Sequence, residues 1–183
     1  MKTTFIYGIG IAVASFVLGL ILFFAGFHSD PEKLGTGQMI GSIAGIVITI
    51  AGLVMVMKAR REEFSPEEGF GYGRALGTGT LTALWSAITG AILTVVYATA
   101  INPGMQEIII ESEIAKMEEK GLPANAIEQA EGVMNFMTSP AMMGVSNLIA
   151  GFVFGFIFSL IVAAFLKRAP VEVAPPPPPP AEA

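Results

Sequence analysis

The residues most suggestive of chemistry form a glycine-rich run between two apolar segments. The run reads Gly69-Phe70-Gly71-Tyr72-Gly73-Arg74-Ala75-Leu76-Gly77-Thr78-Gly79. Glycines this dense can cradle a nucleotide phosphate, but such a site also needs a preceding strand, a following Gly-Lys-Ser/Thr sequence or an acidic residue at ribose distance. None of these accompanies the run. We therefore interpret it as a membrane-interface segment in which Phe70 and Tyr72 lie at headgroup depth and Arg74 reaches toward water.

Side chains suited to catalysis or metal binding are scarce elsewhere. The chain has no cysteine and one histidine, His28, which excludes thiolate metal sites and cysteine nucleophiles and argues against a serine triad. Seven glutamates lie between residues 107 and 131, but their spacing matches no calcium loop. Ser146 and Asn147 form the most polar pair inside an apolar segment, and we interpret them as hydrogen-bonding groups between helices. We expect no enzyme activity and no catalytic, cofactor or metal site.

The composition is typical of a membrane protein. Of 183 residues, 53% are hydrophobic and 14% are charged, whereas soluble domains carry roughly 25% charged residues. So few charges cannot cover a surface that faces water. The net charge of −5 also argues against a nucleic-acid partner, because phosphate binding needs clustered basic residues.

Long uncharged blocks predict four transmembrane helices. They cover about residues 5–27, 39–57, 76–101 and 141–166. The first block forms a helix of about 35 Å, which exceeds the roughly 30 Å hydrocarbon core. Its apolar run continues far beyond Ala12-Val13-Ala14, the candidate cleavage site, so we interpret it as an anchor and not as a signal peptide.

The distribution of lysine and arginine predicts how these spans are oriented. One side carries seven basic residues, namely Lys2, Lys58, Arg60, Arg61, Arg74, Lys167 and Arg168. The other side carries three, namely Lys33, Lys116 and Lys120. Because basic residues favour the cytoplasmic side, we expect both termini in the cytoplasm of a bacterium and residues 102–139 outside its cytoplasmic membrane.

Residues 102–139 are expected to form a helical hairpin. Asn102-Pro103 is typical of a helix start, and Gly121-Leu122-Pro123 is typical of a helix end followed by a new start. Two apolar stripes follow helical spacing, with Ile110, Ile114 and Met117 in the first and Ile127, Ala130, Met134 and Met137 in the second. Three roles are open for these stripes. They pack on each other and on the membrane, they dock a protein partner, or they bind lipid at the interface.

Small residues at four-residue spacing predict where helices approach closely. The candidate packing residues are Gly41, Gly45, Gly151, Gly155 and Ser159. Such stripes let two backbones come together, either within one bundle or between copies in a homo-oligomer. We interpret them as contacts within the bundle. Beyond the membrane domain of residues 1–168, a proline-rich segment over 169–183 predicts a disordered tail.

The order of these features resembles an uncharacterised group of bacterial membrane proteins, domain of unknown function 4199. The resemblance covers nearly the whole chain up to Arg168. It rests on Tyr7-Gly8, the basic stretch 58–61, the glycine-rich run from residue 69, Asn102-Pro103, the glutamate-rich segment, Ser139-Pro140 and the closing Lys167-Arg168. It implies a four-span inner-membrane protein and no specific activity.

The sequence thus predicts an all-α, integral membrane four-helix bundle with an extracytoplasmic helical hairpin between the third and fourth spans. The expected function is that of a non-enzymatic accessory or structural component of the bacterial cytoplasmic membrane, in contact with the lipid bilayer and with a protein partner or further copies of itself. A small permease or channel component is the alternative. It is the weaker one, because no ionisable residue lies inside a span, where coupled transporters usually carry such groups.

Overall fold

The computed structural model describes residues 1–171, and every regular element in that range is a helix. The elements are α1 (Lys2–Phe24), α2 (Pro31–Glu62), α3 (Tyr72–Val96), the π-helix η1 (Tyr97–Ile101), α4 (Met105–Glu119), α5 (Ala124–Met137) and α6 (Pro140–Leu166). Four segments are long and apolar enough to cross a membrane, namely α1, α2, α3 with η1, and α6. The predicted all-helical class with four candidate spans is confirmed. The predicted tail lies outside the described residues except for positions 169–171.

α2 begins well before the predicted boundary at residue 39. Its start is set by Asp30, whose side chain accepts a hydrogen bond from Glu32 N–H at 3.0 Å, and by Pro31 in the first turn. The 32 residues of α2 extend about 48 Å, longer than the hydrocarbon core is thick. The charged residues that limited the predicted span, such as Lys33 and Arg60, therefore lie on helical extensions at its two ends.

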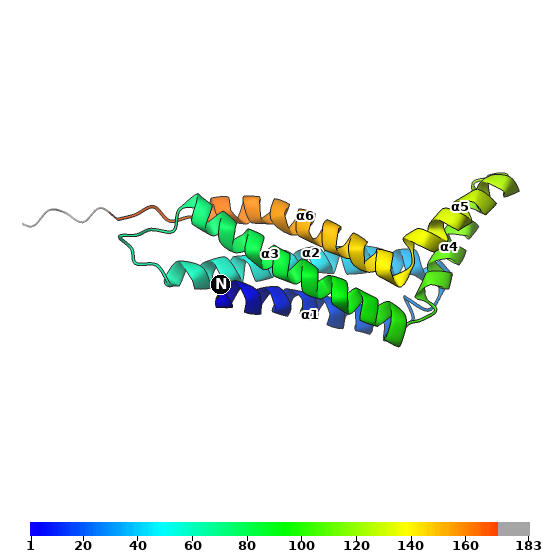
Figure 1. Cartoon of the computed structure of the whole chain (residues 1–183), viewed down its shortest axis with the longest axis horizontal. Helices are drawn as coiled ribbons and strands as arrows, with labels where there is room; N and C mark the ends of the chain where they lie inside the picture. Colours follow the sequence, from blue (N-terminus) through cyan, green and yellow to red (C-terminus); the bar gives the residue numbers. More distant parts are fainter. Residues whose placement is uncertain (172–183) are drawn as a thin grey trace, which may run out of the picture.

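The four long helices form an elongated bundle, and α4 and α5 project from one end of it (Figure 1). The N-terminus, the α2–α3 connection and the end of α6 lie together at the opposite end. Gln106 Nε2, near the start of α4, donates to Asn135 O near the end of α5 at 2.9 Å. Of the predicted apolar stripes, Ile110 on α4 is buried whereas Met137 on α5 is exposed.

α3 and α6 lie side by side along the bundle (Figure 1) and approach closely where glycine is present. A Cβ atom added to Gly155 of α6 would lie 2.7 Å from Ala83 Cβ of α3. α1 meets α3 in the same way, because a Cβ atom on Gly8 would lie 2.6 Å from Trp85 Cβ. Carbon atoms do not pack at such distances, so the spacing of these three helices requires glycine at positions 8 and 155.

The packed core lies toward the end opposite α4 and α5. Its buried members are Leu53, Val56, Met57, Phe70, Ala75, Val162 and Ala163. An isolated antiparallel bridge closes this end, with Phe70 N donating to Arg168 O and Arg168 N donating to Phe70 O, both at 2.8 Å. The Arg168 guanidinium also donates to Phe64 O at 2.8 Å. The end of α6 is thus held against the α2–α3 connection.

The α3–α6 contact predicts opposite effects for the same substitution at two glycines. Gly155→Ala should lower the thermal stability of the purified protein in detergent, by about 1–3 kcal/mol, because the new methyl group overlaps Ala83. Gly10→Ala in α1 is the matched control, since a Cβ atom there meets nothing within 4 Å. It should be neutral or stabilising by up to about 1 kcal/mol. Equal melting shifts in the two variants would contradict this account of the packing.

Candidate functional site

The predicted packing residues occupy two different environments. Ser159 is fully buried on α6, and its Oγ donates to Gly155 O at 2.7 Å. Gly151 has more room, since an added Cβ atom would lie 3.7 Å from Ala87 Cβ. On α2, a Cβ atom on Gly41 would lie 3.3 Å from Leu22 Cδ1, and one on Gly45 would meet nothing within 4 Å. The stripe on α6 therefore contacts α3 closely, whereas the stripe on α2 borders open space.

The three predicted interfacial residues also differ in exposure. Phe70 is fully buried and its ring centroid lies 5.5 Å from that of Phe64, so it belongs to the core and not to a headgroup-facing surface. Tyr72 is 39% exposed, and its hydroxyl donates to Leu160 O at 3.3 Å. Arg74 is exposed and donates to Gly69 O at 3.0 Å. The bridge to Arg168 explains the burial of Phe70, because it draws the connection onto the bundle.

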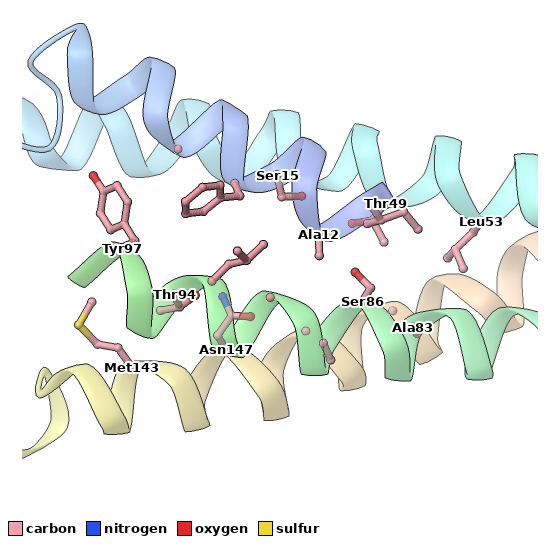
Figure 2. A pocket seen from close by; sticks show the side chains of 18 of the residues that line it. Ala12, Ser15, Thr49, Leu53, Ala83, Ser86, Thr94, Tyr97, Met143 and Asn147 are labelled. Atoms are coloured by element: carbon pink, nitrogen blue, oxygen red, sulfur yellow. The ribbon is translucent and has the colours of Figure 1, made fainter. Parts of the chain in front are cut away.

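A cavity of about 350 Å³ lies in the centre of the bundle, between α1 and α2 on one side and α3 and α6 on the other (Figure 2). This volume falls within the range of small-molecule sites in proteins. Small side chains create the space, namely Ala12, Gly19, Ala83, Ala87, Gly90, Gly151 and Gly155. Polar side chains from all four long helices line it, namely Ser15, Thr49, Ser86, Thr94, Tyr97 and Asn147.

Several of these polar groups are free to bind something else. Thr49 Oγ1 donates to Gly45 O at 2.8 Å within its own helix, as threonine commonly does. Within residues 1–171, by contrast, the side chains of Ser15, Ser86 and Asn147 have no hydrogen-bond partner. An amide or hydroxyl without a partner is costly at membrane depth. The cavity therefore suits a guest that has hydrogen-bonding groups.

The two ends of the cavity are lined by different side chains. At the end near α4, His28 Nδ1 lies within hydrogen-bonding distance of Tyr97 OH, at 2.7 Å, and Asn102 Nδ2 donates to His28 O at 3.0 Å. At the other end, Leu53 lines the cavity and belongs to the packed core. Between the two ends, Asn147 of α6 lines the cavity and is also exposed.

A second cleft of about 400 Å³ lies between α1 and α2 and shares Ser15, Gly19 and His28 with the central cavity. Gly41 and Gly45 also border this cleft, and a Cβ atom on Gly45 would meet nothing within 4 Å. Sequence reasoning missed both spaces. Their only signal was the hydroxyls of Ser15 and Ser86 among small residues, a pattern that also fits ordinary helix packing.

The electrostatics of the central cavity are neutral. No Asp, Glu, Lys or Arg lines it, and His28 at its end is the one lining residue that gains or loses charge near neutral pH. Burial lowers the pKa of His28 below its usual value of 6.5, which favours the uncharged imidazole. In the described part of the chain, no three His, Asp or Glu side chains lie close enough to hold a metal ion. The groups present can form hydrogen bonds to an uncharged guest.

A family described as "Protein of unknown function (DUF4199)" matches residues 6–168. The match covers nearly the whole chain and confirms the resemblance that the sequence features suggested. No curated protein is similar to the chain at a significant level, and no solved structure is.

The environment of His28 predicts that acid destabilises the protein. A group with a lowered pKa binds fewer protons when folded than when unfolded, so its contribution to stability falls as the pH drops below 6.5. Melting temperature should therefore be lower at about pH 5.5 than at about pH 7.5. His28→Gln retains hydrogen-bonding capacity but cannot titrate, so it should reduce this difference. If His28→Gln keeps the full wild-type difference in melting temperature, groups other than His28 cause that difference.

Proposed function

Since the chain belongs to the DUF4199 family, whose model matches residues 6–168, we propose that it is an accessory or structural component of the bacterial cytoplasmic membrane without enzyme activity. Four apolar helices indicate a membrane protein. The family carries no assigned role, so the proposal depends on the geometry of the central cavity.

The observation that carries the proposal is a neutral cavity lined by polar side chains from all four long helices. Hydroxyl and amide groups such as Ser86 and Asn147 bind and orient a guest, but they have no neighbouring base that would make them nucleophiles. Leu53 packs in the core beside one end of the cavity, and Tyr97 contacts His28 beside the other, which favours holding a molecule over passing it across. The uncharged lining favours an uncharged guest that is dissolved in the bilayer. We therefore assign the bundle a binding or scaffolding role.

A small permease or channel component is the second candidate. One observation favours it, namely that the cavity and the neighbouring cleft share Ser15, Gly19 and His28 along α1. A shift of α1 or of the His28–Tyr97 contact would join the two spaces. A route of this kind carries an uncharged solute, because no Asp, Glu, Lys or Arg side chain lines either space.

The orientation that we propose places both termini in the cytoplasm and α4 and α5 outside. Its support is the distribution of charge over the fold. The segments with the seven basic residues, 2, 58–74 and 167–168, lie at the end of the bundle that holds the N-terminus, whereas 33 and 116–120 lie at the other end. This asymmetry favours a cytoplasmic location for the first end.

The orientation can be tested with single cysteines, because the chain has none of its own. Asn125→Cys on α5 should react with a membrane-impermeant maleimide in intact spheroplasts. Glu67→Cys in the α2–α3 connection should react only after the membrane is opened. Both positions are exposed in the fold and make no side-chain hydrogen bond, so neither substitution should disturb packing. Labelling of Glu67→Cys but not of Asn125→Cys in sealed cells would show that the orientation is the opposite of the one proposed.

The two candidate functions predict different behaviour of the cavity. Native mass spectrometry of protein extracted in mild detergent should show a bound uncharged molecule in the wild type. Ser86→Leu should lose it, because the larger side chain narrows the cavity and removes a hydroxyl that lines it. Ser146→Leu is the matched control, since Ser146 is exposed on α6 and does not line the cavity.

The same variants reconstituted in liposomes separate the accessory role from the permease. Wild-type protein should pass no more protons, sodium ions or glycerol than empty vesicles. A flux that Ser86→Leu abolishes and Ser146→Leu preserves would establish the cavity as a transport route. That result would replace the accessory role by the second candidate.

A further inference from the structure

A different pocket lies at the end of the bundle where α2 ends and α3 begins. Arg60, Phe64 and Arg74 border it, and its volume is about 190 Å³. The guanidinium carbon of Arg74 lies 4.6 Å from the centroid of the Phe64 ring, and that of Arg60 lies 5.5 Å from the same centroid. One aromatic ring thus holds two cationic groups beside the pocket.

The charge of this pocket is only partly neutralised. Arg60 pairs with Glu63, yet its Nε is buried without a hydrogen-bond partner among residues 1–171. Arg74 donates to the carbonyl oxygens of Glu68 and Gly69 and pairs with no carboxylate in the described part of the chain. The two guanidiniums beside the pocket are thus balanced by one paired carboxylate, that of Glu63. The excess positive charge favours an anion, and a phosphate group matches the planar fork of arginine.

The face of α3 that continues from the pocket is shaped for an apolar chain. Gly73, Gly77 and Leu81 all border the pocket and follow at four-residue intervals, so they lie on one face of the helix. A Cβ atom on either glycine would meet nothing within 4 Å, so the part of the pocket over them is open, and we call this strip over Gly73, Gly77 and Leu81 the groove. The groove leads to Leu81, which lies about 12 Å from Gly73 along the helix axis. The side chain of Leu81 is 39% exposed.

We infer that this pocket binds one anionic phospholipid. The phosphate lies between Arg60 and Arg74, and an acyl chain follows the groove over Gly77 to Leu81. Free phosphate has no use for the groove, and a zwitterionic lipid brings its own cation beside the arginines. A bound anionic lipid uses both features and connects the end of α2 to the start of α3. The inference is independent of the role proposed for the central cavity.

The test measures thermal unfolding of the full chain in a neutral detergent. Phosphatidylglycerol should raise the melting temperature by about 2–4 °C, because a ligand that binds the folded state stabilises it. Phosphatidylcholine and inorganic phosphate at the same concentration should not. Arg74→Gln should lose the phosphatidylglycerol shift. Gly77→Leu should lose it as well, although every charge is retained, because the new side chain fills the groove.

Lys167→Gln is the control for general surface charge. Lys167 is an exposed basic residue at the same end of the bundle, and it does not border the pocket. This variant should keep the full shift. Equal losses in Lys167→Gln and Arg74→Gln would overturn the inference in favour of diffuse attraction. A shift with inorganic phosphate, or a full lipid shift in Gly77→Leu, would overturn it in favour of an anion site without a lipid. If Arg74→Gln fails to fold, the comparison of Gly77→Leu with Lys167→Gln decides alone.

Discussion

The close approach of α3 and α6 determines how the rest of the bundle is arranged. Within a bilayer, apolar side chains gain little by leaving lipid for protein, so helix association depends on tight contact between small residues. Gly155 against Ala83 provides such a contact, and Gly8 brings α1 onto α3 in the same way. α2 has open space at Gly45 instead. It packs closely near both of its ends, at Gly37 against Phe27 and at Gly52 against Ile11, and the central cavity lies between these contacts and the other helices.

The chemistry of that cavity follows from which polar groups the helices leave unused. Threonine and serine in apolar helices can satisfy their hydroxyls on the carbonyl four residues earlier. Thr78, Thr82 and Ser159 do so here, each at 2.7–2.8 Å. Ser86 and Asn147 do not, and both line the cavity. Two side chains that the helices leave without a hydrogen bond thus face the space for a guest, which supports a binding role.

The two ends of the bundle are built on different principles. At the end with the termini, backbone and guanidinium hydrogen bonds join the α2–α3 connection to the residues after α6, including one from Val171 N to Pro66 O at 2.9 Å. The same connection presents Arg60 and Arg74 around Phe64 and so forms the pocket assigned to an anionic lipid. At the other end, hydrogen bonds link His28 to Tyr97 and to Asn102, and His28 and Tyr97 line the cavity. One end therefore suits charged headgroups, and the other suits an uncharged guest.

The sequence by itself determined the helical class, the four spans and the family, because the length of an uncharged block and the order of its flanking residues are properties of the chain alone. It placed the fourth span almost to the residue, since Ser139-Pro140 and Lys167 mark its ends. It underestimated the length of α2, because the helix extends beyond both ends of the apolar block. Only the tertiary structure decided that Phe70 is buried, that Gly155 meets a neighbour while Gly45 does not, and that Ser86 faces a cavity. Each of these depends on which helix lies opposite, and a periodic pattern within one helix contains no information about its neighbour.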